Sequence, residues 1–190
     1  MNVFDFDKTI FPYDSSALFI EYCFGRYGRL FLRSSPKILA AAAKYRSAGT
    51  GADATALKEQ LFSFLTNVED PDALVQDFWK RNLGKINSWY LELKSSDDVV
   101  ISASPEFLLE PVQKQLGFRL LATRMDKNSG RILGVNCHDA EKVKRFYEAY
   151  PNGRIDNFYS DSLSDSPLAE LAEKAYLVKG SRLTPWPENK

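Results

Sequence analysis

The feature that most constrains the fold is a regular alternation of apolar runs and helical segments in the second half of the chain. Val99-Val100-Ile101 is the clearest run, since consecutive β-branched residues are typical of a buried strand. Strands that alternate with helices form a parallel sheet, so we predict an α/β fold with a Rossmann-like parallel sheet. The expected strands are 99–101, 119–123, 155–159 and 176–178, the expected helices are 105–115, 139–150 and 167–175, and a hairpin is expected at 128–130.

The N-terminal half adds one more strand and then a long helical segment. Val3-Phe4 is a short apolar run that predicts a buried strand, whereas residues 14–94 predict helix almost throughout. We therefore expect the core in residues 1–12 and 96–190, with an all-helical cap inserted at residues 13–95. The expected helices begin near Asp14, Pro36, Asp53, Pro71 and Ile86.

Composition excludes several classes of protein. The chain has 190 residues, of which 44% are hydrophobic and 26% are charged, so it can bury a sizeable core. Its formal net charge is zero, which provides no overall field to recruit nucleic acid. His138 is the sole histidine, so a site with several histidines is untenable and carboxylates are the available catalysts. No obligate protein partner is evident from the sequence.

The sequence also suggests where the protein resides. Cys23 and Cys137 form neither a disulfide framework nor a CxxC pair, which suits a reducing compartment. The chain enters its first strand without a basic and apolar leader, and no apolar stretch approaches the roughly 20 residues of a spanning helix. We expect a cytoplasmic protein, with peripheral contact at the inner membrane surface left open.

Two closely spaced acids follow the first strand. Asp5 and Asp7 are two residues apart, so in an extended segment their side chains point the same way, and the hydroxyl of Thr9 follows. Two carboxylates this close repel each other and persist best where a cation is held or one of them is protonated. A functional site is therefore expected here, although the same pattern could be a solvated acidic turn.

Polar side chains also follow two later strands, where ligands bind in doubly wound sheets. Ser102-Ala103-Ser104 follows the strand at 99–101, and Asp161 and Asp165 follow the strand at 155–159. Lys142 lies near the start of an expected helix. A serine after a strand is usually only a helix cap, and a helical lysine is usually solvated. The occurrence of all of these in one order nevertheless favours a single site.

This order resembles the haloacid dehalogenase (HAD) superfamily. Asp5-Phe6-Asp7-Lys8-Thr9 matches the first motif, Ser102 the second, Lys142 the third, and Asp161 with Asp165 the fourth. The resemblance is strongest to the phosphoserine-phosphatase-like branch, in which a helical cap is inserted between the first and second motifs. It implies an HAD fold and a Mg²⁺-dependent phosphatase that hydrolyses a phosphate monoester.

The resemblance also implies a role for each matching residue. Asp5 would attack phosphorus and form an aspartyl-phosphate, and Asp7 would act as general acid and base. Mg²⁺, which prefers oxygen ligands, would be held by the Asp5 carboxylate, the Asp7 main-chain carbonyl and Asp161, with Asp165 in the outer shell. The residues expected to bind the phosphate are Thr9, Ser102, Ala103 and Lys142.

Four positions bear on the substrate. Asp14 falls where phosphoserine-specific relatives carry a carboxylate that meets the substrate, and a helix cap explains it equally well. Ser104 is a second candidate for substrate contact. The fourth motif departs from the commoner family pattern because it lacks glycines and has Ser164 in place of asparagine. Lys8 also differs from the usual Gly or Ser, so substrate fit is expected to differ too.

A basic, apolar segment lies in the expected cap. Between residues 26 and 52 there are six basic residues and no acid, interleaved with leucines, isoleucine and phenylalanine. Such a segment can lie on an anionic membrane surface, or it can be an ordinary solvated face of a packed cap. The basic residues are Arg26, Arg29, Arg33, Lys37, Lys44 and Arg46.

The sequence leaves the substrate and the fate of the phosphoryl group open. A small-molecule phosphoester is expected, and a lipid phosphate of the phosphatidylglycerophosphate kind is the alternative that the basic segment suggests. A phosphotransferase of the same fold would pass the phosphoryl group to an alcohol instead of water. A phosphate-binding module with impaired turnover is the alternative outside enzymes, prompted by the altered fourth motif.

Overall fold

A computed structural model of the chain describes residues 1–48 and 50–187. Its centre is a sheet of six strands in the order β3-β2-β1-β4-β5-β6, in which all neighbours are parallel except β5 and β6. The predicted α/β fold with a parallel sheet is therefore confirmed. The strands are β1 (Asn2–Phe4), β2 (Val99–Pro105), β3 (Arg119–Thr123), β4 (Ile155–Ser160), β5 (Ala172–Lys179) and β6 (Arg182–Pro185).

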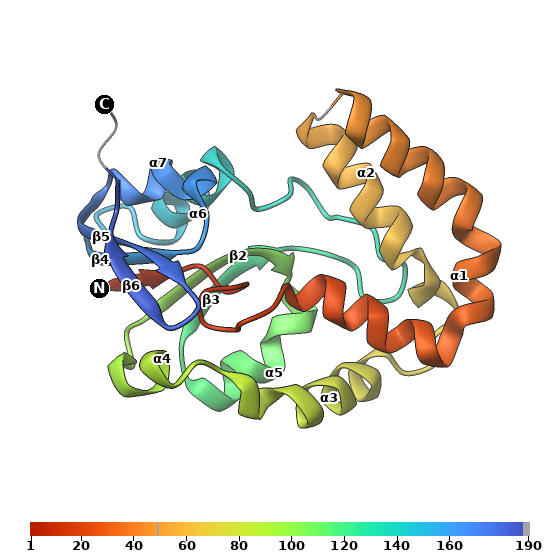
Figure 1. Ribbon diagram of the computed structural model, residues 1–190, viewed down its shortest axis with the longest axis horizontal. Coiled ribbons are helices and arrows are strands. Elements are labelled where there is room, and N and C mark those ends of the chain that lie inside the picture. The colour runs from red at the N-terminus through yellow and green to blue at the C-terminus, as the bar shows by residue number, and fades with distance from the viewer. Residues whose placement is uncertain (49, 188–190) are drawn as a thin grey trace.

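Helices cover both faces of this sheet and extend beyond one end of it. Figure 1 shows α3, α4 and α5 on one side of the sheet and α6 and α7 on the other, with α1 and α2 projecting away. The α-helices are α1 (Ser15–Ala48), α2 (Gly51–Phe62), α3 (Pro71–Asn82), α4 (Ser88–Leu93), α5 (Glu106–Leu116), α6 (Ala140–Ala149) and α7 (Ser166–Ala169). Short 3₁₀ turns follow at Ser63–Asn67, Leu83–Lys85 and Leu163–Asp165.

The first strand lies at the point where the chain changes direction in the sheet. β1 pairs with β2 on one side, where Phe4 lies opposite Val100, and with β4 on the other, where Phe4 lies opposite Tyr159. The chain leaves β1 toward β2 and β3 and later returns to β4 and β5. Ligands bind at such switch points, beyond the carboxyl ends of the strands. The ends of β1, β2 and β4 therefore define the place to look for a site.

Alternating side chains of β1 anchor the two halves of the core. Phe4 stacks on Tyr159 with ring centroids 4.7 Å apart and meets Tyr90 of α4 edge-on at 5.0 Å. Val3 points to the opposite face, where it packs in a cluster with Phe146 and Phe158. Because neighbouring strand residues face opposite ways, three residues are enough to tie both helical layers to the sheet.

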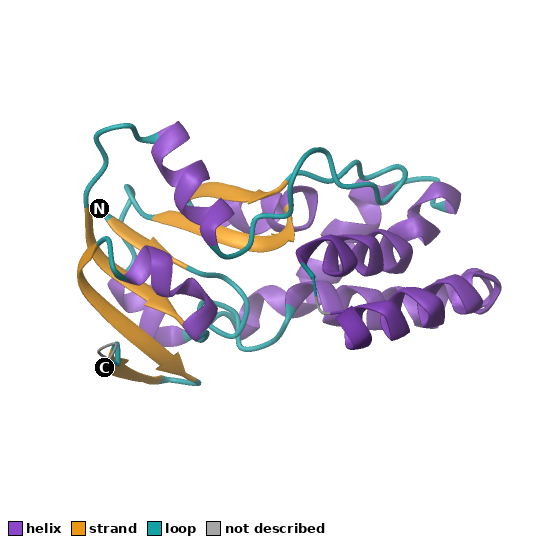
Figure 2. Ribbon diagram, turned by 90° about the horizontal axis from the view of Figure 1, so that it is seen from above, coloured by secondary structure: helices purple, strands orange, loops and turns teal. Residues whose placement is uncertain are grey.

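The helices between β1 and β2 do not all extend away from the sheet. α1 and α2 pack side by side as a projecting hairpin, as both views show (Figures 1 and 2). α3 lies against α5, where the Trp79 indole donates to the Leu108 carbonyl at 2.5 Å, and α4 places Tyr90 beneath β1. The division at residues 13–95 stays a prediction, and within it only α1 and α2 project.

The helix expected to begin at Pro36 is instead a continuation of α1. Proline removes one backbone donor from a helix interior and usually kinks or breaks it. In a regular helix the backbone N–H of residue 36 would donate to the Leu32 carbonyl, but proline has no N–H. Here the Ser35 hydroxyl donates to that carbonyl instead, at 2.8 Å. The helix bends earlier, at Tyr27, where φ is −121° and ψ is 24°. The expected start at Pro36 was therefore wrong.

Other departures lie near the ends of elements. α2 begins at Gly51 because Thr50 caps it, so the expected start at Asp53 is two residues late. The helix expected at 167–175 is only the short α7, since β5 begins at Ala172. β6 was missed. A short hairpin does form around 128–130: Met125 bridges to Ile132 in the antiparallel sense, and the Leu133 amide donates to the Arg124 carbonyl at 2.8 Å.

Candidate active site

The predicted acids meet a buried lysine at the end of β1. Asp5 follows the strand directly, and its backbone amide donates to the Tyr159 carbonyl of β4 at 2.8 Å, which fixes its position. Lys142, in the first turn of α6, places its Nζ atom 2.7 Å from Asp5 Oδ1 and 2.8 Å from Asp165 Oδ2. Residues far apart in sequence thus form one ion cluster. The Ser160 hydroxyl completes it by donating to Asp165 at 2.7 Å.

The cluster holds more negative charge than one lysine balances. Asp5 is 8% exposed and Lys142 is 3% exposed. Burial raises the pKa of Asp5 to about 7, with Lys142 opposing the rise and the carboxylates of Asp165 and Asp7 adding to it. Burial disfavours the charge on Lys142 as well, but the two carboxylates prevail and raise the pKa of its ammonium group. The site therefore favours an additional cation.

Asp7, two residues further along the chain than Asp5, has different hydrogen-bond partners. The Ser104 hydroxyl donates to Asp7 Oδ2 at 2.6 Å, and the Ser15 backbone amide donates to Asp7 Oδ1 at 2.9 Å. Burial first, and then the neighbouring Asp14 carboxylate, raises the pKa of Asp7 to about 6. A carboxyl group with a pKa near 6 can both give and take a proton near neutral pH, as general acid–base catalysis requires.

The structure gives Ser104 and Thr9 positions that the sequence did not indicate. Ser104 lies next to Asp7, and its Oγ atom is 2.9 Å from the hydroxyls of both Ser15 and Ser16. The Thr9 hydroxyl is fully buried and accepts the Asp161 backbone N–H at 3.0 Å. Ser104 therefore fixes the position of Asp7, and Thr9 fixes the backbone of Asp161, each through a hydrogen bond. Neither lies among the residues that line the cavity described next.

A cavity of about 200 Å³ brings the remaining candidates together. Acids from the ends of β1 and β4 share it with the lysine of α6 and with Ser102 and Ala103, which lie within β2 and not, as was expected, after a strand that ends at residue 101. Its lining also includes four residues that were not among the predicted site residues: Lys8, His138, Ser162 and Ser164. The lining residues are Asp5, Asp7, Lys8, Asp14, Ser102, Ala103, His138, Lys142, Asp161, Ser162, Ser164 and Asp165.

A larger cleft of about 860 Å³ adjoins this cavity and shares Asp14, Ala103 and His138 with it. The cleft lies between α2 and the loop that leads to α6. Asp14 also caps α1, because its carboxylate accepts the Ala17 amide at 2.9 Å. The cap explanation for Asp14 is thus correct, and the same residue lines both hollows.

Lys58 of α2, which lines this cleft, contacts the C-terminal part of β2 and the loop that leads to α6. Its Nζ atom donates to the Ala103 carbonyl and to Asn136 Oδ1, both at 2.8 Å. The Thr123 hydroxyl donates to the same two acceptors, at 2.7 and 3.0 Å. Desolvation lowers the pKa of Lys58. Sequence reasoning missed this lysine because nothing in a helix of the expected cap indicates a partner 45 residues away.

Two strained backbone positions flank the cavity. Lys8 and Asp139 are the non-glycine residues with positive φ among residues 1–48 and 50–187, with values of 56° and 49°. Such conformations cost energy in side chains other than glycine and are concentrated at functional sites. Lys8 sits between the two motif acids and Thr9, and Asp139 precedes the helix of Lys142. The strain therefore falls on the two segments that present catalytic candidates.

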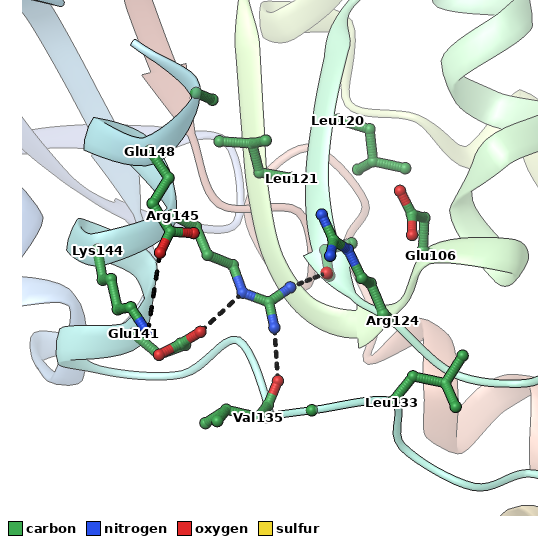
Figure 3. Close-up of a pocket in the computed structure, with 13 residues that line it drawn as sticks. Glu106, Leu120, Leu121, Arg124, Leu133, Val135, Glu141, Lys144, Arg145 and Glu148 are labelled. Carbon is green, nitrogen blue, oxygen red and sulfur yellow. Dashed lines mark hydrogen bonds and ion pairs between the residues drawn. The ribbon is translucent and has the colours of Figure 1, made fainter. Parts of the chain in front are cut away.

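One arginine fixes the helix that carries Lys142. Arg145, one turn further along α6, donates to the carbonyls of Ala122 at the end of β3 and Val135 in the following loop, and it pairs with Glu141 (Figure 3). These contacts hold α6 to the edge of the sheet. The position of the Lys142 ammonium group is thereby tied to two other elements of the core.

The residues present fit a divalent cation. The ligands implied above are two side-chain carboxylates, Asp5 and Asp161, with the Asp7 main-chain carbonyl, which is an all-oxygen set of the kind Mg²⁺ prefers. Within the described residues no group of three acidic, histidine or cysteine side chains could hold a metal ion by itself. The implied ligand set needs no such group, because one of its three ligands is a main-chain carbonyl. Buried Asp165 Oδ1 also has no hydrogen-bond partner among these residues. Burial raises the pKa of Asp161.

Comparison with known proteins settles the family. The profile of the haloacid dehalogenase-like hydrolases matches residues 3–170. The chain belongs to this family. Protein CicA of Caulobacter vibrioides (strain NA1000 / CB15N) is 31% identical over 201 residues, which cover 92% of this chain and 84% of that protein. The HAD membership inferred from the motifs is thus confirmed.

Solved structures agree on the fold. A protein of unknown function from Bordetella pertussis Tohama I superposes with a TM-score of 0.70 at 21% identity, covering 92% of this chain and 87% of that one. A phosphoserine phosphohydrolase-like protein from Francisella tularensis gives 0.54 at 15% identity, covering 92% and 86%. Identities this low support the HAD fold alone. They leave the role of each site residue to the geometry given above.

Proposed function

We propose that this HAD hydrolase is a Mg²⁺-dependent phosphatase acting on a small phosphate monoester. The observation that carries the proposal is the arrangement of Asp5, Asp7 and Lys142 in one cavity at the carboxyl ends of β1, β2 and β4. A buried nucleophile, a separate acid with its own partners and a buried cation are the three groups that phosphoryl transfer to a carboxylate needs. Membership of the haloacid dehalogenase-like hydrolases, whose profile matches residues 3–170, supports a hydrolytic reaction.

Each group has one chemical task in this proposal. Asp5 attacks phosphorus in line, its carboxylate oxygen bonds to the phosphoryl group, and the bond to the leaving oxygen breaks. Asp7 gives its proton to that leaving oxygen and later takes one from the water that hydrolyses the aspartyl-phosphate. Lys142 offsets the negative charge of the phosphoryl oxygens, and Ser102 at the cavity wall donates to them.

The metal would add charge neutralisation to this set. Asp5, Asp161 and the Asp7 carbonyl would hold Mg²⁺, with Asp165 in the outer shell, and the ion would lower the repulsion between the phosphate dianion and the attacking carboxylate. The chain's own residues then orient the reactants. Asp5 is fixed by its bond to the Tyr159 carbonyl, and Asp7 by its bonds to Ser104 and Ser15.

The compartment and substrate remain part of the proposal. Cys23 and Cys137 are both buried free thiols, which suits the reducing cytoplasm. No helix in residues 1–48 or 50–187 is long and apolar enough to cross a bilayer. The cleft of about 860 Å³ beside the cavity leaves room for a metabolite-sized leaving group. We therefore place the reaction on a cytoplasmic phosphoester.

Turnover of p-nitrophenyl phosphate tests the proposal. The purified protein should release p-nitrophenol with Mg²⁺ and not with EDTA, and Asp5→Asn should abolish this release while leaving the circular dichroism spectrum unchanged. Glu110→Gln, an exposed carboxylate on α5, serves as the matched control. A Mg²⁺-independent rate, or full activity in Asp5→Asn, would refute the assignment. Binding of phosphate without any turnover would indicate a binding module instead.

A further inference from the structure

The outer face of α1 exposes an apolar stripe with a basic residue at each end. Leu32 and Leu39 are seven residues apart, so they share one face of the helix, and they are 67% and 68% exposed. Pro36 lies between them on the same face and is also exposed. Arg29 extends the stripe at one end and Arg46 at the other, and both are exposed. We call Arg29, Leu32, Pro36, Leu39 and Arg46 the outer face of α1.

The opposite face of the same helix is packed, so the outer face is held in a fixed orientation. Phe31 is 6% exposed and its ring centroid lies 4.7 Å from that of Phe64. Ile38, seven residues further on, packs against the core cluster. α1 contacts α2 along the hairpin, and Figure 1 shows α1 as its outer member. The exposed leucines thus remain outside because the other side of the helix already fills the core.

Positive charge accompanies this apolar stripe. Six basic residues and no acid lie between residues 22 and 52, although the chain has 25 of each type. The rest of the molecule therefore has six more acids than bases. Two of the six are neutralised locally, since Lys44 pairs with Asp53 at 2.9 Å and Arg26 with Asp77 at 3.7 Å. For Arg29, Lys37 and Arg46 no acidic partner is found within the described residues.

The combination of exposed leucines and unpaired cations selects the partner. An anionic lipid surface attracts basic side chains and takes up apolar ones at the boundary between headgroups and acyl chains. A second copy of the chain would bring two positive faces together in a symmetric contact, and those faces would repel each other. Nucleic acid would match the charge but leave the two leucines without a role.

We propose that the outer face of α1 docks the protein on anionic membrane surfaces. This contact is peripheral: the apolar stripe enters the headgroup region, and the flanking cations meet lipid phosphates or carboxylates. The rest of the molecule has more acids than bases, so an anionic bilayer repels it. The protein therefore docks in one orientation. The proposal does not depend on the phosphatase reaction, because no residue of this face lines the cavity or the cleft.

Vesicle sedimentation with the whole protein tests the proposal. Vesicles of phosphatidylcholine with phosphatidylglycerol should carry the protein into the pellet at low salt, and pure phosphatidylcholine vesicles should not. Because each cation near the surface contributes about 1 kcal/mol, Arg29→Gln with Arg46→Gln should weaken partitioning on the order of 30-fold. Leu32→Ser with Leu39→Ser should also weaken it, and the remaining binding should then depend more steeply on salt.

Matched variants elsewhere keep the test specific. Arg154→Gln with Arg182→Gln removes the same charge from exposed positions near the sheet, and Leu91→Ser with Leu93→Ser removes two exposed leucines of α4. These controls should leave partitioning unchanged. A protein that stays in the supernatant with anionic vesicles at low salt would overturn the proposal. So would equal losses in the control variants, or binding to single-stranded RNA that matches lipid binding and ignores the leucine variants.

Discussion

Replacing Lys142 by methionine should expose how strongly the active-site charges depend on one another. The ammonium group lies 2.7 Å from Asp5 and 2.8 Å from Asp165, and all three side chains are nearly excluded from solvent. Methionine keeps most of the volume but leaves two buried carboxylates without their cation. Breaking a buried pair in this way costs about 3–5 kcal/mol. For a chain of this size that corresponds to a fall in Tm of roughly 6–20 °C.

The loss should depend on pH in a defined direction. Burial already raises the pKa of Asp5 to about 7, and removal of Lys142 takes away the main interaction that opposes this rise. A carboxyl group whose pKa is raised in the folded state favours folding at low pH, and that contribution is lost as pH rises through the folded value. The variant should therefore be most destabilised at pH 8 and recover toward the wild type at pH 5.

Urea unfolding followed by tryptophan fluorescence, in EDTA so that no divalent cation is bound, measures both effects. Lys114→Met provides the control, because that lysine is 76% exposed on α5 and should change stability by less than about 0.5 kcal/mol. A loss below 1 kcal/mol for Lys142→Met at pH 8, or an equal loss at both pH values, would refute the charge argument.

Three further predictions follow from the same geometry. Ser104→Ala should lower kcat on the order of tenfold and shift the alkaline limb of the pH profile upward. The reason is that the Ser104 hydrogen bond lowers the pKa of Asp7, and an unchanged profile would contradict it. EDTA should inactivate the enzyme, with Mg²⁺ but not Ca²⁺ restoring turnover, because Ca²⁺ takes more ligands at longer distances; full activity in Ca²⁺ would argue against the site. Cys23 and Cys137 should resist a thiol reagent at pH 8 until the protein unfolds, since burial raises their pKa values to about 12 and about 11; rapid labelling of the native protein would contradict this.

The sheet and the main site candidates could be predicted from sequence because both depend on local patterns. Alternating apolar runs specify strands, and a polar residue directly after a strand must lie at its end. Asp5 directly after β1 and Asp165 shortly after β4 reach one cavity for this reason, and they meet there Ser102 from the C-terminal part of β2 and Lys142 from the first turn of α6. The parallel order then brings the strand ends together without any further information.

What could not be predicted depends on contacts between distant segments. Pro36 predicts a helix start, whereas α1 continues through it with the Ser35 hydroxyl donating to the Leu32 carbonyl. Lys58 contacts Ala103 of β2 across 45 residues. The Thr9 hydroxyl accepts the backbone N–H of Asp161, a contact between residues 152 positions apart. Thr9 as a phosphate ligand stays a prediction.

The most direct test of the central claim is to trap the phosphoryl group on Asp5. Asp7→Asn should slow breakdown of the aspartyl-phosphate more than its formation when the leaving group is as good as p-nitrophenolate, which needs little help from a general acid. Acid quenching of this variant after mixing with p-nitrophenyl phosphate and Mg²⁺, followed by peptide mass spectrometry, should find one phosphoryl group on Asp5 and none in Asp5→Asn. A phosphoryl group on another residue, or turnover with no phosphorylated peptide at any quench time, would contradict nucleophilic attack by Asp5.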